Sequence, residues 1–567
     1  MAPALDFPCA NWSADNKACK GIGGFSCGSC RLVNYCSPDC QRAHWACHKT
    51  DCKQPLGKPS WQPDWVREGR LPSFVSTPGT WRSDAGNAKC AWGSIPAFDL
   101  LRLGANEGSG HAGDLRLLFA ASGDLRNVVE TVAKLPGEYG RCVRVTVNDW
   151  DLDVVARNVL LLLVALGPDA AEAKVDCMIH VWYSALVRDA DLALLRGRVR
   201  PLLEGVCARI RDKPPKRLVG KTWTLGRVRV RLVLERQAWD GLLAYLDVPA
   251  GLTAAGAREA RASVLAAADR ADLRHRKLML LSSSHRIAAQ RYLDDGLLLP
   301  FAAPRAAFRQ PNPTLFRRDG TWLVSDACDP HRGWSAEAVA ETSSGPATAD
   351  LFGKLFFHLR KTLRTFLARL AQSDFFFQFF QQDVAALAKH LKRDAFDRIE
   401  VSSIADRKAQ GIEPTLLLML PLLQPACVNP HATLVSLFAD AVSEMTTEDD
   451  MVPKGAVIQH LSGYMRLSHQ QMTSNLCDPQ LVKVIMAHGV VRSHEDQFDQ
   501  YMRKHEFRRF GAKYGGAMKT VHTIVAKWPF RLELLPGQPG AQEEFDRLLQ
   551  GGHSGEERFV EWRRTAG

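Results

Sequence analysis

Residues 114–166 read DLRLLFAASGDLRNVVETVAKLPGEYGRCVRVTVNDWDLDVVARNVLLLLVAL and contain the pattern on which the fold depends. Residues 114–121 are an apolar run typical of a buried strand, and residues 125–135 have the periodicity of an amphipathic helix. Residues 142–147 predict a second strand, and residues 152–166 predict a second, strongly apolar helix. Strands and helices that alternate with short links are typical of a parallel, doubly wound sheet.

The same alternation returns in the C-terminal part of the chain. Residues 396–403 predict another strand, residues 415–423 a buried helix or strand, and residues 432–442 a further apolar element. We therefore expect one doubly wound α/β sheet domain, interrupted by a largely helical insertion at residues 190–390.

The expected insertion contains one clear strand signal. Residues 227–235, RVRVRLVLE, alternate as a half-exposed strand does. Residues 254–280 and 347–392 are predicted to be helical. The cluster FFFQFF at residues 375–380 is assigned to the core or to a helix-packing face rather than to a cofactor site.

The composition is that of a globular protein. Of the 567 residues, 46% are hydrophobic and 24% are charged, which excludes a largely disordered, collagenous or disulfide-scaffold chain. Lys and Arg number 73 against 61 Asp and Glu, a formal charge of +12. This excess is spread thinly and no compact basic tract stands out, so we expect it to favour solubility and expect no nucleic-acid partner.

The N-terminus and the apolar stretches indicate the compartment. The start, MAPALDFPCA, has neither a basic segment nor an apolar core, so no secretory signal is expected. The most apolar stretches, residues 154–166 and 415–423, are much shorter than the roughly 20 residues that a membrane helix needs. We expect no membrane partner and a location in the cytoplasm or nucleus. The 15 cysteines would then be thiols or metal ligands.

The cysteines are concentrated at the N-terminus, where eight of the 15 lie within the first 52 residues. Seven of these cysteines and one histidine provide eight ligands, enough for two tetrahedral zinc sites. Such a short head buries too little apolar surface to fold alone, and structural zinc supplies roughly 10–16 kcal/mol per site.

A helix in this head carries part of the ligand set. Ser37 and Pro38 are typical of a helix N-cap and of the first helical position. The helix that follows would present Cys40, His44 and His48 on one face. Two histidines therefore compete for one ligand position, and their spacing alone does not choose between them.

The head resembles the MYND zinc finger. The residues that carry the resemblance are Tyr35-Cys36, Cys40-Gln41, Trp45, His48-Lys49 and Cys52. The resemblance selects His48 over His44 and leaves Cys47 as a spare thiol. The first two cysteines are separated by nine residues instead of the usual two, as in the fungal variant of the family.

The resemblance also implies two interleaved zinc sites and a binding function. One zinc would be held by Cys9, Cys19, Cys36 and Cys40, and the other by Cys27, Cys30, His48 and Cys52. MYND fingers bind proline-rich segments of other proteins, and Gln41 and Trp45 would line the peptide groove. The alternative is that Trp45 simply packs the small core of the finger.

The ends of the first two predicted strands form a second candidate site. Ser122-Gly123-Asp124 follows the first strand and Asp149 follows the second, so both should lie at the carboxyl edge of the sheet. This resembles class I methyltransferases and implies that Gly123 and Asp149 hold S-adenosylmethionine. The turn has one glycine where that family has three, and the alternative is ordinary turn chemistry with a helix-capping acid.

Residues 114–183 also resemble a domain of unknown function. It accompanies MYND fingers in fungal proteins and forms the N-terminal domain of an axonemal dynein assembly factor. Residues 117–129 and 147–160 carry this resemblance. It implies a methyltransferase-like fold without an established activity.

These observations divide the chain into six segments. Residues 1–54 are the finger, 55–96 a connector, 97–189 the first half of the α/β domain, 190–390 the insertion, 391–490 the second half, and 491–567 a C-terminal extension.

The remaining motifs do not indicate catalysis. The loop with Asp326, Asp329 and His331 is expected to be a capped polar loop rather than a metal site. No hydrolase, metalloprotease or nucleotide-binding motif occurs. The leading hypothesis is a zinc-binding adaptor or scaffold, and the alternative is an S-adenosylmethionine-dependent methyltransferase whose finger recruits substrate.

Overall fold

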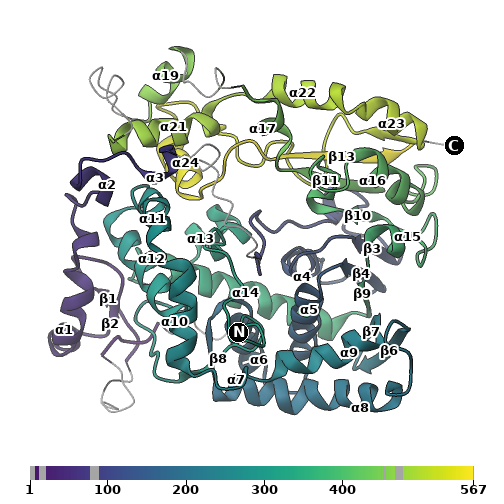
Figure 1. Ribbon diagram of the computed structural model, residues 1–567, viewed down its shortest axis with the longest axis horizontal. Coiled ribbons are helices and arrows are strands. Elements are labelled where there is room, and N and C mark those ends of the chain that lie inside the picture. Colours follow the sequence, from purple (N-terminus) through teal and green to yellow (C-terminus); the bar gives the residue numbers. More distant parts are fainter. Residues whose placement is uncertain are drawn as a thin grey trace.

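A nine-stranded mixed sheet forms the centre of the protein (Figure 1). The computed structural model describes residues 7–11, 19, 21–76, 89–447, 450, 455–465 and 477–565. The strand order is β12-β13-β11-β10-β3-β4-β9-β7-β6. The strands are β3 (Leu115–Phe119), β4 (Val143–Asp149), β6 (Leu218–Leu225), β7 (Val228–Glu235), β9 (Phe375–Gln381), β10 (Arg398–Glu400), β11 (Thr433–Phe438), β12 (Gly516–Met518) and β13 (Arg558–Arg564).

The six central strands, from β11 to β7, are parallel. The register places Leu117 of β3 opposite Val145 of β4 on one side and opposite Arg398 of β10 on the other. Antiparallel pairing occurs at both ends of the sheet, where β6 pairs with β7 and where β13 lies between β11 and β12. The predicted parallel sheet is therefore present, with antiparallel additions at its borders.

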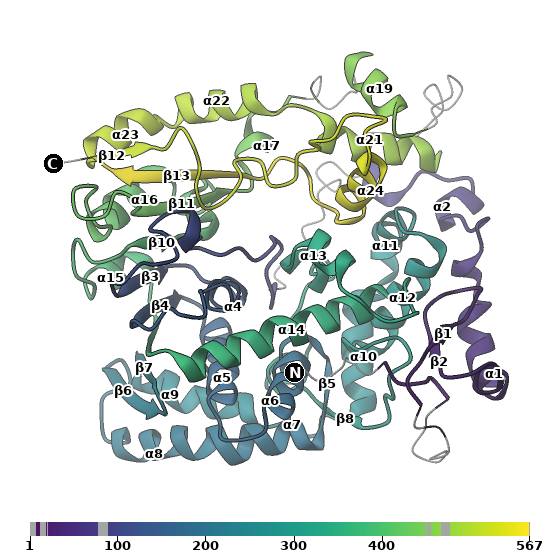
Figure 2. The same ribbon diagram turned by 180° about the vertical axis from the view of Figure 1, so that it is seen from behind.

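Long helices cover one face of the sheet. Figures 1 and 2 place α4 (Arg126–Ala133), α5 (Leu152–Ala165) and α14 (Leu351–Gln372) on one side of the strands, and α15 (Val384–Ala388) and α16 (Ile412–Met419) on the other. Inward-facing side chains on the first side, such as Leu117 and Phe377, are fully buried. Covered parallel strands of this kind need nearly continuous apolar sequence, which 114–121 and 375–380 supply.

The remaining described elements flank this sheet. The finger contains β1 (Phe25–Ser26), β2 (Asn34–Tyr35) and α1 (Pro38–Cys52), and β5 (Leu186–Arg188) pairs with β8 (Phe308–Pro311). The other helices are α2 (Asp64–Arg67), α3 (Ser73–Ser76), α6 (Ala171–Tyr183), α7 (Asp189–Leu194), α8 (Arg200–Ile210), α9 (Arg236–Leu242), α10 (Ala254–Leu265), α11 (Ala271–Leu278), α12 (Ser283–Asp295), α13 (Ala336–Glu341), α17 (Ala441–Met445), α19 (Gly455–Ser462), α21 (Pro479–Val491), α22 (Glu495–Lys504), α23 (Phe507–Lys513) and α24 (Ala541–Gln550).

The strands and helices predicted from the strongest sequence patterns are present in the structure. The predicted strands and helices of residues 114–166 are β3, α4, β4 and α5, with ends that differ by a few residues. The alternating segment 227–235 is β7, and the predicted strand at 396–403 is β10. Residues 415–423, predicted as helix or strand, form the end of α16 and a short 3-10 turn.

The structure differs from the expectation of a continuous helix at residues 347–392. Helix α14 ends before Ser373, and the phenylalanine cluster that follows is β9, a central strand between β4 and β7. Aromatic side chains have high strand propensity, and a run of them fits a strand buried on both faces. The expected helical insertion thus contributes β6, β7 and β9 to the sheet, and the C-terminal extension contributes β12 and β13.

One pair of cysteines departs from the expectation that all are thiols or metal ligands. Cys90 and Cys328 form a disulfide with an S–S distance of 2.01 Å. They meet because the connector at Lys89 pairs in parallel with Val324, with the Lys89 carbonyl accepting a bond from the Ser325 amide at 2.9 Å. Sequence alone gave no sign that residues 238 positions apart would meet.

Among the described residues, no helix is both long and apolar enough to span a membrane.

Candidate metal centres and the strand-end site

The finger is built from a two-stranded hairpin and one helix. β1 pairs with β2 antiparallel, and α1 begins at Pro38 as its sequence predicts. The Ser37 hydroxyl accepts a hydrogen bond from the Cys40 amide at 3.2 Å, which caps the helix and fixes the position of Cys40. Gly21 lies so close to Cys36 that a Cβ atom at position 21 would be 2.6 Å from the Cys36 Cβ. The chain therefore needs glycine there to bring its first cysteines against Cys36.

Eight side chains of the finger gather into two groups. Within each group the sulfur and nitrogen atoms lie within 4.8 Å of one another. One group is Cys9, Cys19, Cys36 and Cys40, and the other is Cys27, Cys30, His48 and Cys52. These are the two sets that the sequence led us to expect, with consecutive ligand pairs alternating between the groups.

The distances within each group suit zinc. A tetrahedral zinc ion with Zn–S bonds of about 2.3 Å holds its sulfur ligands about 3.8 Å apart. The Sγ atoms of Cys19 and Cys36 are 3.3 Å apart, and those of Cys27 and Cys52 are 3.9 Å apart. In the second group, Sγ of Cys30 lies 3.3 Å from Nε2 of His48. The donor chemistry and the spacing therefore both fit two zinc ions, and zinc there would hold the finger together.

The structure separates the two histidines of α1. His48 is buried and turns its Nε2 toward Cys30. His44 lies outside both groups, and its Nδ1 is hydrogen-bonded to the Tyr35 hydroxyl at 3.0 Å. Cys47 is exposed and also lies outside both groups. The contacts of each imidazole ring, rather than its position along the helix, distinguish the two histidines. For this reason the spacing in the sequence could not choose between them as zinc ligands.

Burial and hydrogen bonding set the protonation of the ligands. Burial lowers the pKa of His48 to about 4, so its imidazole is neutral and able to ligate at neutral pH. Burial raises the pKa of the Cys30 thiol well above its usual range. Hydrogen bonds from Asn11 and Cys36 lower the pKa of the Cys40 thiol to about 7. Zinc binding would thus have to displace protons from the thiols whose pKa is raised, Cys30 in the second group and Cys36 in the first among them.

The finger is fixed to the body of the protein. The rings of Phe7 and Phe357 pack edge to face at 5.1 Å, and Arg291 forms a 2.6 Å ion pair with Asp51. The Arg31 carbonyl accepts a bond from the Ala349 amide at 3.1 Å. These contacts join the finger to α12, to α14 and to the loop before α14, so it does not hang from a free linker.

The expected peptide-binding side chains lie on α1. Gln41 and Trp45 are both half-buried. The Trp45 ring packs edge to face against the His48 ring at 6.0 Å, and its inner part joins the finger's apolar cluster. Trp45 therefore contributes to packing and also presents part of its ring to solvent.

The second candidate site, at the carboxyl ends of β3 and β4, is closed by its own hydrogen bonds. Gly123 has a φ of +56°, as its turn requires. Its amide donates to Oδ2 of Asp149 at 3.1 Å, and the Asp151 amide donates to Oδ1 at 3.0 Å. Burial raises the pKa of Asp149. Gly123 and Asp149 are thus brought together as expected, but both carboxylate oxygens already accept main-chain bonds.

The connector also lies against this turn. Asp124 accepts bonds from the Gly93 amide at 3.2 Å and from the Trp182 indole at 3.3 Å. Arg126 pairs with Asp124 at 2.6 Å and donates to the Ile95 carbonyl at 2.9 Å. The chain itself therefore makes the contacts around this turn.

Sequence reasoning missed one buried acid at the same edge of the sheet. Glu400 ends β10, and its Oε1 accepts a bond from the Ser402 amide at 2.6 Å. Burial raises the pKa of Glu400 to about 7. A glutamate at the end of a predicted strand gave no signal, because burial cannot be read from sequence.

Polar contacts hold the loop of residues 326–331. Asp326 pairs with Arg270 at 2.8 Å, and Asp329 accepts a bond from the His331 amide at 2.9 Å. Within the described part of the chain, these side chains do not gather into a group able to hold a metal.

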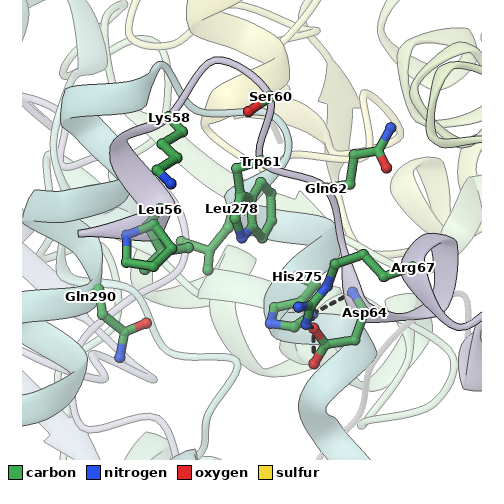
Figure 3. Close-up of a pocket in the computed structure, with 11 residues that line it drawn as sticks. Leu56, Lys58, Ser60, Trp61, Gln62, Asp64, Arg67, His275, Leu278 and Gln290 are labelled. Atoms are coloured by element: carbon green, nitrogen blue, oxygen red, sulfur yellow. Dashed lines mark hydrogen bonds and ion pairs between the residues drawn. The ribbon is translucent and has the colours of Figure 1, made fainter. Parts of the chain in front are cut away.

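A pocket of about 410 Å³ lies between the connector and helices α11 and α12 (Figure 3). Trp61 and Leu278 form its apolar wall, and the Trp61 and His275 rings pack edge to face at 5.6 Å. Nδ1 of His275 accepts a bond from the Asp64 amide at 3.2 Å. The connector therefore packs against the body of the protein through specific contacts. It nevertheless leaves an open space beside the finger.

Comparison with known protein families supports two of the expectations. Residues 16–52 match the MYND finger, and residues 91–187 match a domain of unknown function, DUF4470. The chain thus contains a MYND finger and a DUF4470 domain. Cys9 lies outside the matched range, and its place in the first group comes from the structure. No match was found among curated proteins or among solved structures.

Proposed function

We propose that this protein is an adaptor or scaffold that recruits protein partners through its zinc-loaded MYND finger, and that it acts in the cytoplasm or nucleus. The observation that carries the proposal is the pair of four-ligand groups at zinc-like distances in a segment that matches the MYND finger. MYND fingers generally mediate protein–protein interactions. The contacts of the finger with α12 and α14 would hold its binding face in one orientation.

We assign four ligands to each zinc ion. The first site is Cys9, Cys19, Cys36 and Cys40, and the second is Cys27, Cys30, His48 and Cys52. Zinc chemistry fits both donor sets, because thiolate and imidazole ligands at these distances favour tetrahedral zinc. The role of zinc would be structural, since each set supplies all four ligands and leaves no open position.

We infer that the partner presents a proline-rich, extended segment to Gln41 and Trp45. A half-buried indole ring fixed by its own core contacts is a good platform for such a segment, because both sides lose little conformational entropy on binding. The measurement is binding to an array of proline-rich peptides. Trp45→Ala should abolish peptide binding while the protein keeps two zinc ions. Lys49→Ala, which changes an exposed residue of the same helix, is the control and should leave peptide binding intact. Unchanged capture by Trp45→Ala would remove Trp45 from the binding site.

We further propose that the sheet domain has a methyltransferase-like fold. The support is its strand order: in chain order β3, β4, β9, β10 and β11 occupy the 3-2-1-4-5 arrangement of doubly wound sheets. The antiparallel β13 inserted beside β11 is typical of class I methyltransferases rather than of dinucleotide-binding domains.

We infer that this fold does not act as an enzyme here. Asp149, the residue expected to hold a ribose, already accepts bonds from the Gly123 and Asp151 amides. Isothermal titration of the zinc-loaded protein with S-adenosylmethionine should therefore show no saturable heat. Saturable binding near 1 μM, about 8 kcal/mol, that is lost in Asp149→Ala would reverse this inference and favour the methyltransferase.

A further inference from the structure

Arginines that are far apart in the sequence meet on one face of the sheet. The strand register places Arg116 of β3 opposite Arg144 of β4, and Arg144 opposite Phe376 of β9. Phe376 in turn lies opposite Arg229 of β7, and Arg229 opposite Thr224 of β6. One row of side chains therefore crosses five strands.

A second row runs beside the first, two residues further along the strands. It contains Gln378 of β9, Arg231 of β7 and Thr222 of β6. Because alternate residues of a strand face the same side, both rows share one face of the sheet. We name this surface the arginine face; its residues are Arg116, Arg144, Thr222, Thr224, Arg229, Arg231, Phe376 and Gln378.

Solvent reaches this face. Arg116, Arg229, Thr222 and Thr224 are exposed, and the other four members are half-buried. The neighbours in sequence, such as Val145 and Val230, are fully buried on the opposite face. Helices α15 and α16 cover the adjoining part of this side, where Leu387 and Leu416 pack with Leu118 and Phe380. Parallel strands are normally covered on both faces, so this uncovered region is a departure that needs an explanation.

The charge on the face is poorly compensated. Among the described residues, one acidic side chain lies within 4.0 Å of its arginines, Asp114 beside Arg144. The guanidinium of Arg229 stacks over the Phe376 ring at 4.8 Å, and Arg231 donates to the Thr222 hydroxyl at 3.4 Å. Asp374, at the start of β9, pairs with Arg227 in the hairpin turn at 3.1 Å. Arg229 and Arg231 are thus held by neutral neighbours, with hydrogen-bond donors left over.

We propose that the arginine face binds an acidic, extended segment of a protein partner. Arg229 and Arg231 are two residues apart on one strand, a separation of about 6.6 Å, which equals the spacing of alternate side chains in an extended peptide. Asp or Glu at every second position would meet these guanidinium groups, and arginine binds carboxylates with two parallel hydrogen bonds.

The details of the face favour a peptide over single-stranded nucleic acid. Nucleic-acid platforms combine a broad positive groove with free aromatic rings on which bases stack. Here the ring of Phe376 is covered by Arg229, and the carboxylates of Asp114 and Asp374 lie at one border. Four arginines across two rows suit a few carboxylates rather than a long phosphate chain.

The test is fluorescence anisotropy with the full-length, zinc-loaded protein. The probe is a labelled peptide of repeated Glu-Thr, with a repeated Gln-Thr peptide and a single-stranded DNA of similar length as comparisons. Arg116→Gln and Arg229→Gln should each weaken binding of the acidic peptide by about threefold or more, and about 300 mM salt should weaken it further. Arg258→Gln removes an exposed arginine of α10 outside the face and should leave binding unchanged.

Two results would overturn the proposal. The first is that the acidic peptide does not bind, or that it binds with equal affinity to wild type, Arg116→Gln and Arg229→Gln. The other is binding of the DNA that is at least about tenfold tighter and depends on the same arginines, which would assign the face to nucleic acid. Thermal unfolding of each variant, expected to match wild type for Arg116→Gln, separates loss of binding from loss of fold.

Discussion

Exchanging the two histidines of α1 for alanine, one at a time, tests the metal centre most directly. Both lie on one face of the same helix, one turn apart, so each variant is the matched control of the other. Nε2 of His48 is 3.3 Å from Sγ of Cys30, whereas Nδ1 of His44 is bonded to the Tyr35 hydroxyl at 3.0 Å. His48→Ala should therefore remove one of four zinc ligands, and His44→Ala should remove none.

The expected size of the effect follows from the energy of such sites. A structural zinc site contributes about 10–16 kcal/mol, so one ligand of four corresponds to about 2.5–4 kcal/mol. That loss weakens zinc binding about 100- to 1,000-fold. Loss of the hydrogen bond between His44 and the Tyr35 hydroxyl costs about 1 kcal/mol of stability and no zinc affinity.

The assay is zinc content per chain after dialysis against a graded series of a chelator. Wild type and His44→Ala should retain two zinc ions through the range in which His48→Ala retains one. The remaining zinc of His48→Ala should be lost when Cys36 is also changed, because Cys36 belongs to the first group. Loss of zinc from His44→Ala, with full retention in His48→Ala, would refute the ligand set.

Three further predictions concern stability and the remaining cysteines. Arg398→Met leaves the Glu107 carboxylate, whose side chain is 5% exposed and lies 2.8 Å from Arg398, without its charged partner; Asn429 still donates to it, at 3.3 Å. The substitution should lower the stability to urea by about 3–5 kcal/mol; a loss below about 1 kcal/mol would contradict this, and adding Glu107→Gln should recover part of the loss. After zinc removal in denaturant without reductant, a thiol reagent should modify 13 of the 15 cysteines. Cys90→Ser should free the thiol of Cys328 and raise the count to 14, all the cysteines that this variant has, whereas a wild-type count of 15 would exclude the disulfide. The low pKa of His48, about 4, means that the unfolded finger takes up a proton between about pH 6.5 and pH 4 that the folded finger excludes. Zinc retention by the second site should therefore fall as the pH is lowered through this window, in addition to the loss caused by protonation of its thiols; retention that is flat over this window in wild type would contradict it.

Sequence was sufficient where local chemistry decides the outcome. The ligand spacing and the resemblance to the MYND finger led to the two groups that the structure brings together. The strands around Leu117 and Val145 were found because buried parallel strands require uninterrupted apolar runs. Neither result depends on contacts between distant parts of the chain.

Sequence was insufficient where long-range pairing decides. The cluster at Phe375–Gln381 has the composition of a strand or of a packed helix, and only its place between β4 and β7 makes it a strand. The C-terminal strand β13 is defined by pairing with β11, across more than a hundred residues. The closure of the strand-end site was also hidden, because the bond from Gly123 to Asp149 depends on the relative position of two turns.

The positions of the two proposed binding surfaces bear on what kind of adaptor this is. In both Figures 1 and 2, α1 lies at one edge of the molecule, and β6 and β7 lie toward the opposite edge. The finger is fixed to the body through the Phe7–Phe357 and Asp51–Arg291 contacts, so it does not swing toward the arginine face. A single short segment therefore does not reach both surfaces.

The two surfaces differ in chemistry, since one is proposed to bind proline-rich segments and the other acidic segments. This difference favours a scaffold that holds two partners, or two distant parts of one partner, at a fixed separation. Such an arrangement raises the local concentration of one partner near the other without any new contact between them. Addition of the acidic peptide should then leave the affinity of the finger for its proline-rich peptide unchanged, and competition between the two peptides would show that they share one site.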